Sequence, residues 1–215
     1  MEIQDVVKEI KQSFRQMMDG SIAQSMRDKG VGYHLNWGAT IPRLREKADE
    51  LSTLYTQHST LYDLAIALWK ENVRECKILA TMLMPPDEIL PEVVDIWMEQ
   101  TETLEVAEQA SMNLYCRLPY APQKAYQWIA SDKPLYQLCG FHVLSRLFMN
   151  GQEPNERGIN EFLDQALVAL QQSGDSPLIL AVRKAAMNSI SHFADLGLVY
   201  ERLADSAIRN YTKGR

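Results

Sequence analysis

Hydrophobic residues recur every three or four positions along most of the chain, with polar residues between them. Between Pro42 and Met84 this pattern forms three successive amphipathic segments, and no alternating strand pattern separates them. The apolar positions are Leu44, Ala48, Leu51 and Tyr55, then Leu61, Leu64, Ala65 and Leu68, then Cys76, Ile78, Leu79, Met82 and Leu83. This spacing predicts consecutive helices that pack against one another as hairpins.

Short segments rich in Pro, Gly, Asn or Asp interrupt the pattern up to the C-terminus, and such residues end helices or cap the next one. We predict about ten or eleven helices of roughly 11 to 20 residues. They group into degenerate pairs over 42–70, 72–100, 103–131, 134–172 and 177–213. These lengths overlap those of HEAT-type repeats, so we expect an all-α fold, a helical-repeat α-solenoid (α-α superhelix). A globular helical bundle is the alternative.

The 215-residue chain, 46% hydrophobic, can bury a substantial core. We predict a single HEAT-like repeat domain over 1–215, with an N-terminal helix and capping loop in 1–40 and helical hairpins in 41–215. The sequence contains no run of eighteen apolar residues, which a membrane span would require. The segment MEIQDVVKEIKQSFRQ is too charged for a signal peptide. We therefore expect a cytoplasmic protein that does not contact membranes.

Cysteine and histidine give little support to a metal site. The three cysteines, Cys76, Cys116 and Cys139, lie in apolar helical patterns, where we expect buried small hydrophobic residues. The four histidines form no HxxxH or HExxH pair. Walker, GxGxxG and GxSxG motifs are also missing from the sequence. We therefore predict no metal and no cofactor.

The net charge of −6 disfavours nucleic-acid binding unless positive residues gather on one face. Equivalent positions of successive helices line one face of a solenoid, so basic residues in different repeats can converge there. The candidates for phosphate contacts are Arg43, Arg45, Arg74, Lys77, Arg183 and Lys184. The alternative is that they are solvated surface residues in pairs with neighbouring carboxylates.

Several short motifs follow one another in a fixed order. NWGATIPRLR (36–45) is followed by ALW (67–69), Arg74-Glu75 and KILA (77–80), and more weakly by 93–97 and AVRKA (181–185). In order and spacing they resemble the bacterial AlkD-like DNA alkylation repair family, whose members are HEAT-like solenoids. The resemblance covers most of the chain. It implies a DNA-binding concave surface and, in active members, excision of alkylated purines such as 3-methyladenine and 7-methylguanine.

The resemblance also implies a site. Excision requires a carboxylate near the sugar, where positive charge develops, and aromatic side chains that face the cationic base and the backbone. The family motif Trp-Asp-x-Val-Asp corresponds to TLEVAEQA (103–110), so Glu108 is the candidate catalytic carboxylate and Glu105 its neighbour. Leu104 takes the aromatic position, and LYQLCGF (135–141) takes the place of an arginine pair. The motif therefore departs from that of active relatives.

Both carboxylates have a structural alternative, because acidic residues near a helix N-terminus complement the helix dipole. The aromatic groove candidates are Tyr33, Trp37, Trp97 and Tyr115. Tyr33 and Trp37 lie in a loop that can stack on a base or close the end of the solenoid. Trp97 and Tyr115 can equally be packing residues.

The leading hypothesis is a DNA alkylation repair-type protein that binds DNA, alkylated or structured, on a helical-repeat face, with glycosylase activity left open. The rival is a noncatalytic solenoid that binds a protein or peptide. The acidic net charge and the missing arginine pair favour the rival.

Overall fold

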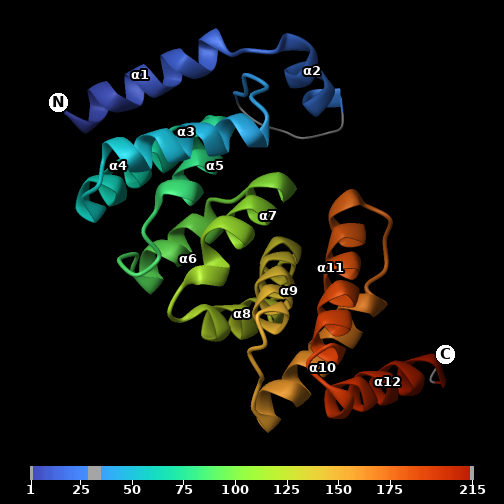
Figure 1. Ribbon diagram of the computed structural model, residues 1–215. Coiled ribbons are helices and arrows are strands. Elements are labelled where there is room, and N and C mark those ends of the chain that lie inside the picture. Colours follow the sequence, from blue (N-terminus) through green and yellow to red (C-terminus); the bar gives the residue numbers. More distant parts are fainter. Residues whose placement is uncertain (1, 29–34, 214–215) are drawn as a thin grey trace. The chain divides into compact units, whose positions relative to one another are not determined.

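The computed structural model describes residues 2–28 and 35–213 (Figure 1). The described residues form twelve α-helices and one short 3₁₀ helix, with no strand among them. The α-helices are α1 (Ile3–Gln16), α2 (Gly20–Asp28), α3 (Ile41–Leu54), α4 (His58–Lys70), α5 (Arg74–Leu83), α6 (Pro91–Glu99), α7 (Leu104–Asn113), α8 (Ala121–Ile129), α9 (Pro134–Met149), α10 (Glu156–Gln171), α11 (Pro177–Ala194) and α12 (Leu198–Lys213). The 3₁₀ helix is η1 (Tyr115–Arg117). The all-α prediction is confirmed, with slightly more helices than the pattern indicated.

The helices begin where the sequence breaks predicted them. Proline occupies the first or second position of α3, α6, α8, α9 and α11, where its missing N–H costs no helical hydrogen bond. Thr103, Asn155 and Ser176 cap the N-termini of α7, α10 and α11, each by accepting a backbone N–H three residues later.

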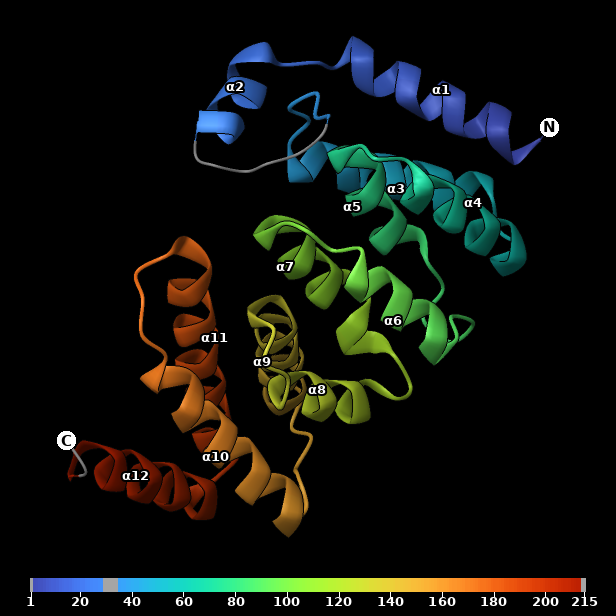
Figure 2. The same cartoon turned by 180° about the vertical axis from the view of Figure 1, so that it is seen from behind.

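The chain forms two compact units, Met1–Leu114 and Tyr115–Arg215. In the first unit α3 packs beside α5 and α5 beside α7, so these three helices form one row. Helix α4 packs against α5 and α1 against α4 (Figures 1 and 2). The row matters for function because it contains six of the predicted site residues: Arg43, Arg45, Arg74, Lys77, Glu105 and Glu108.

In the second unit α9 packs against both α8 and α11, and α11 also contacts α10 and α12. Phe148, Phe162 and Phe193 form an aromatic cluster with ring centroids 5.1–5.5 Å apart. Gly140 in α9 lets that helix approach α8 closely, since a Cβ there would lie 2.8 Å from the carbonyl oxygen of Ala125.

Cys76 and Cys139 are buried, as predicted, and burial raises the pKa of the Cys76 thiol to about 12. Cys116 is only partly buried, which corrects the expectation for that residue. No described helix has the length and apolar character needed to cross a bilayer. Within the described ranges, no three His, Cys, Asp or Glu side chains gather as metal ligands.

Candidate nucleic-acid interface

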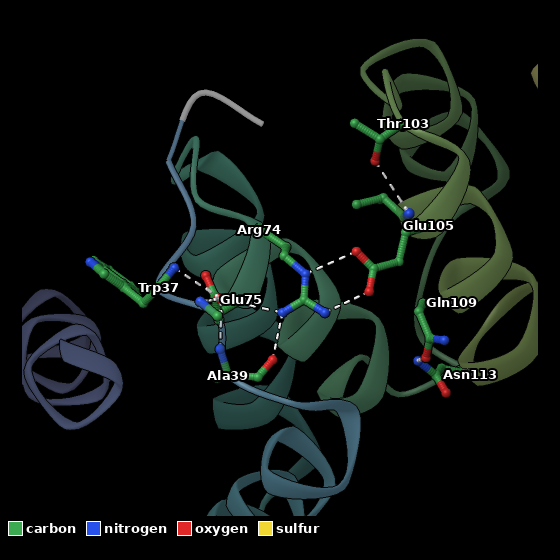
Figure 3. A network of polar contacts seen from close by, with 10 residues as sticks. Trp37, Ala39, Arg74, Glu75, Thr103, Glu105, Gln109 and Asn113 are labelled. Carbon is green, nitrogen blue, oxygen red and sulfur yellow. Dashed lines mark hydrogen bonds and ion pairs between the residues drawn. The ribbon is translucent and has the colours of Figure 1, made fainter. Parts of the chain in front are cut away.

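The Glu75 carboxylate, at the start of α5, binds the loop that precedes α3 (Figure 3). Its Oε1 atom accepts backbone N–H groups of Trp37, Gly38 and Ala39 at 3.0–3.2 Å. The side chain is 0% exposed, so its charge is stabilised by these donors and by Arg74 rather than by water. The carboxylate therefore holds the loop against the start of α5.

Arg74 extends the network from this loop to α7. Its Nη1 donates to the carbonyl oxygen of Ala39 at 2.6 Å and to Glu75 at 3.2 Å. Its Nε and Nη2 atoms donate to the two carboxylate oxygens of Glu105 at 2.9 and 2.5 Å, a bidentate pair. Arg74 is 1% exposed and Glu105 is 26% exposed, so the network runs from the buried Glu75 outward to Glu105 (Figure 3).

The local sequence explains this arrangement. Gly38 has φ +79°, a left-handed conformation that presents three successive N–H groups to one oxygen. A Cβ at Gly38 would lie 2.4 Å from the carbonyl oxygen of Asp19 and 2.8 Å from the backbone nitrogen of Ala23. The loop thus also fits tightly against the start of α2.

Arg74 and Glu105, two of the predicted site residues, therefore lie in contact, but they bind each other. Arg74 is buried and its guanidinium is bound within the protein, so it is not exposed as a phosphate contact in this structure. Glu105, the second carboxylate candidate, is the residue that binds it. Glu108 lies one turn later on α7, is partly exposed, and is the remaining carboxylate candidate.

The aromatic candidates are packing residues in the described structure. Trp97 is buried and stacks on Trp69, with ring centroids 4.2 Å apart and ring planes within 4°. Lys77 lies over the other ring of this pair, with its Nζ 4.8 Å from the Trp69 centroid. Burial lowers the pKa of Lys77, and Glu102 opposes that effect. Lys77 thus packs on the Trp69–Trp97 stack, an arrangement that was not predicted from the sequence.

Trp37 is buried beside Phe14, at 6.2 Å between centroids, and the Arg15 guanidinium lies 5.7 Å above it. This favours the packing alternative for Trp37 over base stacking. Tyr115 is buried edge-on against Trp128. Tyr33 lies outside the described residues.

The other basic candidates lie nearer solvent. Arg43 and Arg45 on α3 and Lys184 on α11 are exposed. Arg183 is partly buried, and its Nη2 donates to the carbonyl oxygen of Gly174, in the loop before α11. Arg43, Arg45 and Lys184 are thus accessible to a phosphate backbone, whereas Arg183 also holds a loop.

Charge is distributed unevenly between the two units. The first contains 11 Lys and Arg residues and 19 Asp and Glu residues, whereas the second contains 11 and 9. The excess negative charge of the whole chain therefore belongs to residues 1–114. The second unit instead has a small excess of positive charge, so the negative net charge of the whole chain does not apply to it.

Comparison with known structures identifies the fold. The chain is similar to a solved structure described as "A new family of proteins related to the HEAT-like repeat DNA glycosylases with affinity for branched DNA structures". The TM-score is 0.73 at 15% identity, over 94% of this chain and 80% of that chain. At this identity the likeness establishes the fold alone, a HEAT-like helical repeat, which confirms the predicted class.

The family follows from the sequence match. The family model described as "DNA alkylation repair enzyme" matches residues 10–167, most of the chain. The protein belongs to this DNA alkylation repair family, and the resemblance to AlkD-like proteins is confirmed. No curated protein matches the sequence.

Proposed function

We propose that this protein binds DNA, with a preference for branched or otherwise structured DNA, and that it does not excise alkylated bases efficiently. Membership of the DNA alkylation repair family and the likeness to a protein of a family described as having affinity for branched DNA structures support this function. The DNA-binding residues we propose are Arg43, Arg45, Lys77, Arg183 and Lys184.

The positive excess of the second unit is the observation that carries the proposal, because nonspecific DNA affinity comes mainly from basic residues that neutralise phosphates. Lys184 is exposed on α11 and Arg183 is its neighbour.

Inefficient base excision is supported by the state of the candidate site. The aromatic candidates within the described residues are buried against other rings, and Glu105 is bound by Arg74. Base excision requires an accessible aromatic surface and a carboxylate at the sugar at the same time. Only Glu108 remains to supply the carboxylate.

Replacing Lys184 by Glu is expected to weaken DNA binding about tenfold at low salt and to reduce the slope of log K against log salt concentration by about one. Fluorescence anisotropy with a four-way junction and a matched duplex, each at two salt concentrations, measures both quantities. Lys70→Glu is the control, because Lys70 is also exposed but lies on α4, a helix that contains none of the proposed DNA contacts. Equal effects of the two reversals, or no binding by the wild type at low salt, would contradict the proposal.

The same samples test base release from methylated DNA. We expect little release by the wild type. If release is detected, Glu108→Gln should reduce it at least a hundredfold with binding unchanged, because a neutral amide does not stabilise the sugar cation. Release that survives this substitution would show that Glu108 is not the catalytic carboxylate.

The rival function, binding of a protein or peptide, is favoured by one observation. Leu198 and Val199 at the start of α12 are about two-thirds exposed, and exposed apolar residues that adjoin one another are typical of interaction surfaces. A protein that binds neither junction nor duplex DNA at low salt would favour this function instead.

A further inference from the structure

Arg74 presents one edge of its guanidinium toward Glu105, which is partly exposed. The inner edge, through Nη1, is held by the Ala39 carbonyl oxygen and by Glu75. The outer edge, Nε with Nη2, is the edge that binds carboxylates and phosphates through two parallel hydrogen bonds. The two carboxylate oxygens of Glu105 accept these two hydrogen bonds, from Nε at 2.9 Å and from Nη2 at 2.5 Å (Figure 3).

We propose that the outer edge of Arg74 is a binding site for an oxyanion such as a DNA phosphate, and that in the free protein Glu105 occupies it as an internal substitute. This inference rests on the proposed function for the identity of the physiological anion, but the anion site itself does not depend on DNA binding.

Three features of the structure support an anion site. First, Arg74 is 1% exposed and held from behind, so its guanidinium is already oriented and little entropy is lost when an anion binds. Second, Glu75 receives three backbone N–H groups in addition to Arg74, so much of its charge is stabilised without the arginine. Arg74 therefore retains positive charge toward its outer edge.

The third feature is the position of the outer edge beside the first turn of α7. Glu105 is the second residue of this ten-residue helix, and Thr103 caps it. The N-terminus of a helix favours negative charge, whether it comes from a side chain or from a bound phosphate. An anion that replaces the Glu105 carboxylate would thus meet the arginine and the helix terminus together.

Glu105 is also the member of the network that can leave most easily. Its side chain is 26% exposed, whereas Arg74 and Glu75 are buried. Since the Glu105 carboxylate can be hydrated after it leaves, exchange with an anion does not leave a buried charge without a partner.

The experiment is chemical rescue of Glu105→Ala by inorganic anions. Thermal unfolding is measured in sodium sulfate, sodium phosphate and sodium chloride at equal ionic strength. Sulfate stabilises most proteins by exclusion from their surface, so the wild type and Glu102→Ala serve as controls. Glu102 is exposed and three residues away, and its substitution removes the same charge without vacating Arg74.

Glu105→Ala is expected to gain about 3 °C or more in sulfate or phosphate beyond the gain of either control, since an anion that binds only the folded state stabilises it. The Nε–H resonance of Arg74 should shift with sulfate in this variant alone. Equal gains for all three proteins and an unmoved Arg74 resonance would overturn the proposal.

Glu105→Asp covers the case in which Glu105→Ala does not fold. The shorter side chain withdraws the carboxylate from Arg74 but keeps a negative charge at the start of α7, and an intermediate anion-dependent gain is expected. If this variant is folded and shows no gain beyond the controls, the anion site is excluded.

DNA binding by the same variants separates this proposal from the proposed function. Glu105→Ala should steepen the salt dependence of DNA binding by about one phosphate contact relative to Glu102→Ala. Anion rescue without any DNA binding would support the site and overturn the proposed function. DNA binding without anion rescue would support the function and overturn the site.

Discussion

Replacing Glu75 by Ala is expected to lower the free energy of unfolding by about 3–5 kcal/mol, the range measured when one partner of a buried ion pair is removed. The substitution leaves the N–H groups of Trp37, Gly38 and Ala39 without their acceptor and removes one of the two carboxylates that bind Arg74. Each unsatisfied buried donor adds to the cost. Urea unfolding, followed by circular dichroism, measures the change.

The matched control is Glu71→Ala, which removes a carboxylate four residues earlier. Glu71 pairs with Lys11 at 2.6 Å, but both side chains are more than a quarter exposed, so the loss should be about 1 kcal/mol or less. Hydrogen exchange gives a local reading: the amides of residues 37–39 should lose protection only when Glu75 is replaced. A change within 1 kcal/mol of the Glu71 control would show that the Glu75 network is not a principal support of the first unit.

Gly38→Ala is expected to cost about 2–5 kcal/mol. Part of this is the strain of a left-handed backbone, about 1–2 kcal/mol for alanine at φ +79°. The rest is steric, because a Cβ would lie 2.4 Å from the Asp19 carbonyl oxygen and 2.8 Å from the Ala23 nitrogen. Both are backbone atoms, which cannot move aside as a flexible side chain can.

Gly151→Ala separates the two contributions. Gly151 has nearly the same backbone angle, φ +76°, but a Cβ there meets nothing within 4 Å. The Gly151 substitution should therefore cost only the backbone strain, and the difference between the two variants is the steric cost at Gly38. Equal losses of unfolding free energy in the two variants would mean that the loop moves away from α2 without penalty.

The helices could be predicted from sequence because their signals are local. Apolar spacing and capping residues act within one or two turns, so α7 begins at Leu104, directly after the Thr103 cap and one residue after the predicted start of the pair 103–131. The division into units at Leu114 could not be predicted, since it depends on contacts between distant helices.

The candidate site was harder to predict because its pairings are long-range. Arg74 and Glu105 are 31 residues apart, and each matched a functional role when considered alone. One local signal was present in the sequence: Arg74 and Glu75 lie between Val73 and Cys76, in the apolar pattern of their helix. Adjacent opposite charges within an apolar stripe indicate buried groups with internal partners. The aromatic residues gave no such signal, because spacing does not distinguish a packed ring from an accessible one.

The Glu75 hydrogen bonds have a consequence for how the protein can be shortened. In repeat proteins each repeat contacts mainly its neighbours, so removal of a terminal repeat directly affects only one interface between repeats. Here the donors to Glu75 lie 36 to 38 residues before it in the chain. Deleting the segment before α3 would remove all three and leave a buried carboxylate with only an arginine. A shortened variant therefore requires a neutral, well-packed residue in place of Glu75. For the same reason, a chimera with a relative must exchange the segment 35–39 and helix α5 together.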